Sequence, residues 1–310
     1  MKRSRTALLT LICIALFAPA AQASFAGQNG RIYFATSKKG HGLKEDIFSM
    51  TPRGTDIRRV ADLRGGQREP AVSPDAGQLA FWSYGTDDPG LWTMGADGSA
   101  PALLADSSTN TQPAFLADGE TVAYRDLVDG PSEQSDEHIF TVAADGSPPG
   151  ETPLLAVPGE RYRFPTFSSD GELMAFVQAD ETPATQSWNV YVADADGTDR
   201  VPVVTRRTDD YAPDISPDGE RIVFWSRARG ELDIFSVRIN GTRLQRLTRH
   251  NGVNEWMPDY SPNGNKIVYM RERGKYPDIF KMNANGSHPR ALTHFKRRAL
   301  QPDWATKPAG

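Results

Sequence analysis

Two stretches in the second half of the chain decide its fold: residues 213–226, PDISPDGERIVFWS, and residues 233–248, DIFSVRINGTRLQRLT. In both, β-branched and aromatic residues form short apolar runs with the side-chain alternation of strands. The Asp-Gly pair that ends at Gly219 and the Asn-Gly pair that ends at Gly241 supply tight turns, because glycine tolerates positive φ. These residues predict one unit of short antiparallel strands joined by turns.

The same unit recurs along the chain. Each copy contains a proline followed by an apolar strand, and these prolines lie 43 to 52 residues apart, at Pro70, Pro113, Pro165, Pro213, Pro258 and Pro302. Repeats of about 40 to 50 residues with four short strands each are typical of propeller blades. The copy that starts at Pro302 ends with the chain, and the N-terminal segments RIYFATS and DIFSMTPRGTDIRRV complete it. We therefore predict an all-β, six-bladed propeller with four-stranded blades, in which a C-terminal strand A joins N-terminal strands B–D.

The first residues have the composition of a secretory signal peptide. Three basic residues within the first five precede an apolar run over residues 7–17, and the small-residue motif AQA ends at Ala23. The apolar run is too short to cross roughly 30 Å of hydrocarbon, which argues against a membrane anchor. We predict a leader over residues 1–23, a propeller over residues 24–310, and an exported protein that is periplasmic or secreted.

The composition excludes several classes of function. A net charge of −4 over 310 residues is unlike that of a general nucleic-acid binder, which is strongly basic. The single cysteine, Cys13, lies in the predicted leader, so the mature chain would have no disulfide and no cysteine ligand. No later stretch is long and apolar enough to span a membrane. We predict no nucleic-acid partner, no membrane span, no cofactor, no metal site and a monomeric protein.

The repeat SPDGERIVFWS…DIFSVRINGTRLQRLT resembles that of the periplasmic TolB family of propellers, and the resemblance covers essentially the whole predicted mature chain. TolB carries an α/β domain ahead of its propeller, whereas the repeats here begin about six residues after the predicted cleavage site. The resemblance implies a propeller-only relative that binds a component of the cell envelope and has no enzymatic activity.

The mouth of the central channel is the first candidate site. Loops that join strands B and C, and the connections between blades, emerge on one face of a propeller, here called the top face. The innermost strands begin at this face, so the residues just before the prolines surround the mouth. Charged, amide and aromatic groups there could hold a peptide terminus or a small polar ligand, or could neutralise one another around bound water. The predicted mouth residues are Arg68, Glu69, Gln112, Arg163, Tyr211, Glu255, Trp256 and Gln301.

The charges of the top loops are predicted to segregate. Acidic residues gather in the loops of blades 2 to 4, whereas basic residues gather in blades 1, 5 and 6, which are neighbours in the closed ring. Such a bipolar face can orient a charged partner and raise its association rate; the alternative is solvated charge without a partner. The basic residues predicted to bind a partner are Lys38, Lys39, Arg227, Arg229, Arg271 and Arg273.

Three carboxylates occupy one repeat position, directly after the proline, in three neighbouring blades. They are Asp214, Asp259 and Asp303. Oxygen ligands of this kind could bind a cation near the channel. An aspartate at such a position more often accepts hydrogen bonds from the backbone of an adjacent turn.

The first functional prediction is an exported, non-enzymatic propeller that binds a protein, a peptide or another cell-envelope component through its top face and channel mouth. One alternative is a carbohydrate-binding protein or a metal-dependent uronate-sugar lyase. It rests on His41, His250 and His294, because some propeller lyases use a histidine-held metal, although no metal-binding spacing is present. The other alternative is a structural repeat module without a ligand.

Overall fold

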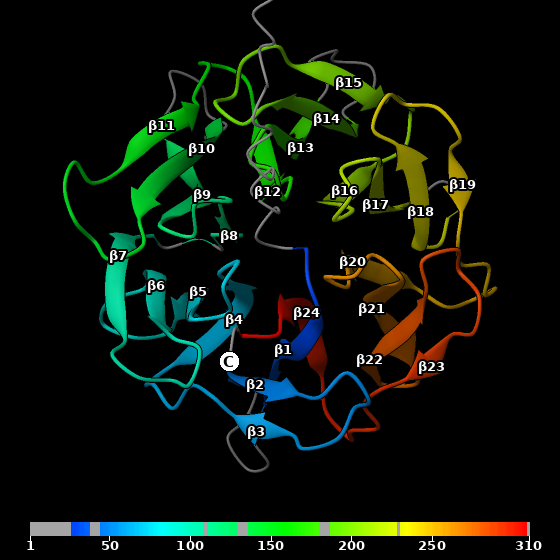
Figure 1. The fold of residues 1–310 in the computed structure, drawn as a ribbon, viewed down its shortest axis with the longest axis horizontal. Coiled ribbons are helices and arrows are strands. Elements are labelled where there is room, and N and C mark those ends of the chain that lie inside the picture. Colours follow the sequence, from blue (N-terminus) through cyan, green and yellow to red (C-terminus); the bar gives the residue numbers. More distant parts are fainter. Residues whose placement is uncertain are drawn as a thin grey trace, which may run out of the picture.

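Six sheets of four antiparallel strands surround one axis in the computed structural model of the chain (Figure 1). The predicted all-β, six-bladed propeller is therefore confirmed. The structure describes the segments 26–37, 44–107, 109, 111–128, 136–179, 187–227 and 230–308, and only the backbone of Arg273. The predicted leader lies outside the described residues.

Each blade starts with its innermost strand at the axis and ends with a short strand at the rim. Blade 1 consists of β24 (Ala299–Thr306), β1 (Asn29–Ser37), β2 (Glu45–Met50) and β3 (Arg58–Arg59). Blade 2 consists of β4 (Gly66–Val72), β5 (Gln78–Tyr84), β6 (Gly90–Gly95) and β7 (Ala102–Asp106). Blade 3 consists of β8 (Ala114–Phe115), β9 (Thr121–Val128), β10 (Asp136–Ala143) and β11 (Thr152–Leu155).

The other three blades repeat this order. Blade 4 consists of β12 (Tyr162–Phe167), β13 (Leu173–Ala179), β14 (Trp188–Asp194) and β15 (Val201–Val204). Blade 5 consists of β16 (Asp210–Ile215), β17 (Arg221–Ser226), β18 (Asp233–Arg238) and β19 (Gln245–Arg246). Blade 6 consists of β20 (Glu255–Tyr260), β21 (Lys266–Arg273), β22 (Tyr276–Asn283) and β23 (Arg290–Ala291).

The two ends of the chain meet in blade 1, as predicted. The C-terminal strand β24 pairs antiparallel with β1, and Trp304 lies opposite Ile32. Farther along the pair, the hydroxyl of Thr36 donates a hydrogen bond to the carbonyl of Arg298 at 2.5 Å. This pairing closes the ring with main-chain hydrogen bonds and covers the inner edge of β1.

The core lies between the blades and is built from the repeat. The same position of the second strand carries one fully buried aromatic ring in every blade. These rings are Phe34, Phe81, Tyr124, Phe176, Phe224 and Tyr269. Phe81, for example, packs with Ile47 of blade 1. Because large aromatic surfaces dominate the free energy gained on burial, one ring at each position stabilises the blade seams.

A turn of the backbone before the proline of each innermost strand sets the lining of the channel. The residue before the proline has a positive φ of 47° to 55° in all six blades, and the strand pairing shifts register beside it, as a bulge, in every blade except blade 3, where β8 begins after Pro113. These residues are Glu69, Gln112, Phe164, Ala212, Met257 and Gln301. Residues with a Cβ rarely adopt this conformation, so the packing of the ring must hold it.

Candidate functional site

A central cavity of about 220 Å³ is lined by the innermost strands of all six blades. Two rings of side chains contribute most of its chemistry. The upper ring, near the top face, consists of the residues before the prolines. The lower ring consists of the residues that follow the prolines, which include Asp214, Asp259 and Asp303.

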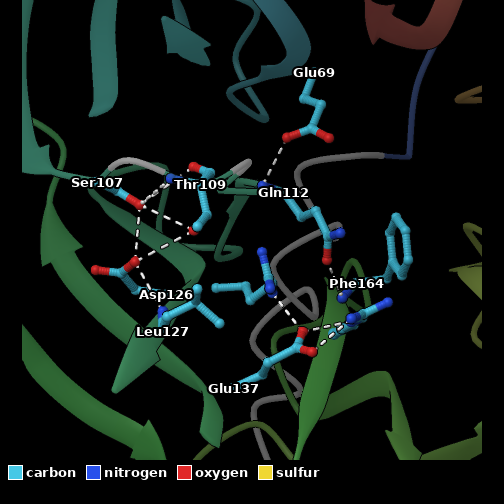
Figure 2. A network of polar contacts seen from close by, with 10 residues as sticks. Glu69, Ser107, Thr109, Gln112, Asp126, Leu127, Glu137 and Phe164 are labelled. Atoms are coloured by element: carbon cyan, nitrogen blue, oxygen red, sulfur yellow. Dashed lines mark hydrogen bonds and ion pairs between the residues drawn. The ribbon is translucent and has the colours of Figure 1, made fainter. Parts of the chain in front are cut away.

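Half of the upper ring is polar, and its members hold one another in place. Gln301 Nε2 donates to Glu69 Oε1 at 3.2 Å. The other oxygen of Glu69 accepts the backbone N–H of Gln112 at 2.9 Å, and Gln112 Oε1 accepts the backbone N–H of Phe164 at 3.0 Å (Figure 2). Each side chain thus reaches the equivalent residue of the next blade, so blades 1 to 4 are connected at the mouth.

The other half of the upper ring is apolar. Phe164, Ala212 and Met257 occupy the equivalent positions of blades 4, 5 and 6, and all three line the cavity. The edge of the Phe164 ring faces Tyr211, with 6.0 Å between ring centroids. The mouth is therefore amphipathic: one half presents amide and carboxylate groups, and the other presents an apolar surface.

The carboxylates of the lower ring connect blade 5 to blade 6, blade 6 to blade 1 and blade 1 to blade 2. Asp214 Oδ2 accepts the backbone N–H of Tyr260 at 2.7 Å, and Asp259 Oδ2 accepts that of Trp304 at 2.8 Å. Asp303 accepts the backbone N–H of Val72 in the same way. As in the second predicted role, the carboxylates accept backbone N–H groups, but the donors lie in the innermost strand of the next blade rather than in an adjacent turn.

The lower carboxyl groups are shielded from bulk water by the ring, although they face the cavity. Burial raises the pKa of Asp214 to about 7. Burial and the nearby charge of Asp214 raise the pKa of Asp303, and burial with both neighbouring carboxylates raises that of Asp259 well above its usual value. Asp214 therefore exchanges its proton near neutral pH rather than near pH 4, and the pKa values of the other two carboxyl groups are raised in the same direction.

The predicted mouth residues divide into three groups. Glu69, Gln112 and Gln301 line the cavity. Arg68 and Arg163 instead reach across the seam to the preceding blade. Arg68 binds Glu45 through two hydrogen bonds of 2.8 and 3.1 Å.

The carboxylate of Glu137 receives Arg163 from blade 4 and Arg125 from its own blade, the latter at 2.6 Å (Figure 2). Burial raises the pKa of Glu137, but the hydrogen bonds and charges of the two arginines outweigh this effect, so the pKa is lowered. Glu137 is thus an ionised, buried anchor between blades 3 and 4.

The remaining predicted mouth residues lie beside the cavity rather than in its lining. The ring of Tyr211 stacks on Trp225 with 4.8 Å between centroids. Trp256 is partly buried against the core between blades 6 and 1. The side chain of Glu255 is 0% exposed and lies under Arg271, whose guanidinium is 2.5 Å away.

The six predicted basic residues are not equivalent in the structure. Lys38, Lys39 and Arg229 lie outside the described residues, and so does the side chain of Arg273. Arg227 is exposed, whereas the side chain of Arg271 is only 13% exposed because it pairs with Glu255 and contacts the ring of Phe280. The charge of Arg271 is therefore balanced within the fold.

The predicted histidine group is only partly described, since His41 lies outside the described residues. His250 Nδ1 is 3.3 Å from Glu255 Oε1, and His294 is exposed. Among the residues that the structure describes, no group of three histidine, cysteine or acidic side chains could hold a metal ion.

Three residues that line the mouth were not identified from the sequence: Phe164, Ala212 and Met257. The bulge turns the residue directly before the proline toward the axis, and the sequence shows no sign of this turn except the proline itself. Choosing that one position in every copy would have selected the whole upper ring.

Comparison with known proteins gives consistent results. A family profile described as the TolB beta propeller domain matches residues 154–309. The protein TolB homolog of Chlorobium luteolum is 29% identical over 150 residues, which are 48% of this chain and 31% of the relative. The matched region thus spans about a third of that curated relative's length.

Solved structures share the fold. TolB from Acinetobacter baumannii superposes with a TM-score of 0.74 at 20% identity, over 90% of this chain and 67% of that one. A putative TolB from Agrobacterium tumefaciens superposes with a TM-score of 0.65 at 20% identity, over 89% and 92%. No helix in the described part of the chain is long and apolar enough to cross a bilayer.

Proposed function

Because this chain belongs to the TolB β-propeller family, we propose that it is an exported, non-enzymatic propeller that binds a protein or peptide of the cell envelope through its top face and channel mouth. The proposal includes a leader over residues 1–23 and a mature propeller over residues 24–310. Its export to the periplasm or beyond rests on the composition of that leader and on the family.

The amphipathic mouth is the observation that carries the proposal. A cavity with an apolar wall and a few fixed polar groups is the usual form of a binding site. The polar half is rigid, because Glu69 and Gln112 are both 8% exposed and each is held by the neighbouring blade. A peptide side chain could pack on Phe164 and Met257 while its backbone meets the amide of Gln301.

A photo-crosslinking experiment tests this proposal. Benzoylphenylalanine is placed at Met257, on the mouth, or at Arg53. Arg53 is exposed in a turn on the face opposite the top face, here called the bottom face. Mature protein carrying either probe is irradiated in envelope extract from the source cells, and adducts are identified by mass spectrometry. We expect a defined protein adduct at Met257 and none at Arg53.

Equal labelling at the two positions would contradict a top-face site. A glycan adduct at Met257 without a protein adduct would favour the carbohydrate alternative. No adduct at either position, from protein that melts like the wild type, would favour a structural module without a ligand.

A further inference from the structure

Three aromatic side chains cluster on the top face where blades 4 and 5 meet. Tyr211 lies between the other two: it stacks on Trp225 at 4.8 Å and is tilted against Trp188 at 5.8 Å between ring centroids. Tyr211 and Trp225 are both partly exposed, whereas Trp188 is 8% exposed. This cluster continues the apolar half of the mouth outward, because Tyr211 also contacts Phe164.

Two arginines cover the indole of Trp188. The guanidinium carbon of Arg163 is 4.2 Å from the ring centroid, and that of Arg161 is 5.3 Å from it. Arg163 is already paired with the carboxylate of Glu137. Arg161 is partly exposed and forms no ion pair with any described residue. Its guanidinium lies over an aromatic face, and no carboxylate in the described part of the chain pairs with it.

A further cation lies beside the cluster, because the backbone N–H of Arg227 donates to the carbonyl of Asp209 at 3.2 Å. Arg227 follows Trp225 by two residues at the end of β17, is exposed, and has no carboxylate partner among the residues described. One acidic group is close: Asp209 Oδ1 accepts the backbone N–H of Trp188 at 3.3 Å. Two arginines without an ion pair among the described residues, Arg161 and Arg227, therefore lie near the aromatic cluster.

Two positive charges near this seam have no ion pair among the described residues. They belong to Arg161 and Arg227, and the one carboxylate in the described part of the chain that contacts the aromatic cluster, that of Asp209, accepts a backbone N–H instead. Tryptophan, tyrosine and arginine are the residue types enriched at the energetic centres of protein interfaces. A guanidinium that lies flat on an indole loses little entropy when it binds a carboxylate in bidentate fashion.

We propose that Arg161, Trp188, Tyr211, Trp225 and Arg227, together called the blade 4–5 patch, dock an acidic peptide segment of the partner. This inference deepens the proposed function and rests on it. Aspartate or glutamate side chains of the segment bind Arg161 and Arg227, and an apolar or aromatic side chain between them packs on Tyr211 and Trp225. The segment then continues toward the apolar half of the mouth.

A displayed library of random 12-residue peptides tests the proposal without knowledge of the partner. Mature wild-type protein is the bait, next to the double variant Arg161→Gln/Arg227→Gln and the control Arg53→Gln, which removes an exposed cation from the bottom face. Thermal melting checks that all three are folded; neither patch arginine forms an ion pair with a residue that the structure describes. We expect peptides rich in Asp, Glu and aromatic residues from wild type and control.

Synthetic copies of the enriched peptides should bind the double variant about tenfold more weakly than wild type, and binding to wild type should weaken as salt rises. Enrichment of basic or charge-neutral peptides, or equal binding to the double variant, would overturn the inference and leave the proposed function intact. Arginine-dependent binding of polygalacturonate without acidic peptides would also overturn it, in favour of an acidic glycan. No enrichment of peptides by any of the baits would count against both the inference and the proposed function.

Discussion

Asp259 Oδ2 accepts a hydrogen bond from the backbone N–H of Trp304 at 2.8 Å. Trp304 belongs to β24, the strand that closes the ring, so this one carboxylate connects blade 6 to the end of the chain. Asp214 connects blade 5 to blade 6 in the same way, and Thr166 connects blade 4 to blade 5 by donating to Asp214 Oδ1 at 3.3 Å. The channel lining therefore holds the ring together as well as forming a candidate site.

Replacing Asp259 should weaken the closure. Asp259→Ala leaves the N–H of Trp304 without its acceptor inside the ring, which costs about 1 to 3 kcal/mol of unfolding free energy. Asp259→Asn keeps an acceptor oxygen and should cost less. Urea unfolding measures both, with Asp62→Ala on an exposed loop as the control. A loss from Asp259→Ala no larger than that of the control would disprove this role.

The lower carboxylates should make stability depend on pH. Burial raises the pKa of Asp214 from 3.8 in the unfolded chain to about 7 in the folded protein. Between these values the folded state binds a proton that the unfolded chain has released, so this group's contribution to stability falls as pH rises. The stability of Asp214→Asn relative to wild type should therefore rise between about pH 4 and pH 7. Denaturation midpoints across this range measure it, and a constant difference would refute it.

Glu137 should contribute far more to stability than an exposed acidic residue that also contacts two arginines. Glu137→Gln leaves the buried guanidinium of Arg125 with less compensation, and loss of one partner of a buried pair costs about 3 kcal/mol or more. Asp56 also contacts two arginines, Arg31 and Arg58, but at the surface. Asp56→Asn is therefore the matched control and should change the denaturation midpoint little. Similar shifts for the two variants would argue against a buried anchor.

Charge reversal should affect stability differently at Arg271 and at Arg227, the two predicted basic residues whose side chains the structure describes. Arg271→Glu would place a second carboxylate against Glu255, which is fully buried, so the melting temperature should fall by several degrees. Arg227→Glu changes an exposed charge and should leave the melting temperature near that of wild type. Differential scanning fluorimetry distinguishes them. Equal melting temperatures would show that Arg271 does not stabilise the fold.

The repeat made the blades predictable because its signals are local. Alternating apolar residues and tight glycine turns, such as the one at Gly219, specify each hairpin within a few residues. The split copy that begins at Pro302 requires a partner at the other end of the chain. The observed pairing of β24 with β1 follows directly. The polar half of the mouth could also be predicted from the sequence, since Glu69, Gln112 and Gln301 lie directly before their prolines.

The sequence by itself determined the number of blades, their strand order and their closure. Only the tertiary structure decided which side chains face the channel and which charges are available to a partner. The positive φ before the proline turns Phe164 and Met257 toward the axis, and the proline marks the position in the sequence without showing which way the preceding side chain points. Arg271 is buried on Glu255 while Arg161 lies unpaired on Trp188, because an ion pair depends on which blades meet in space.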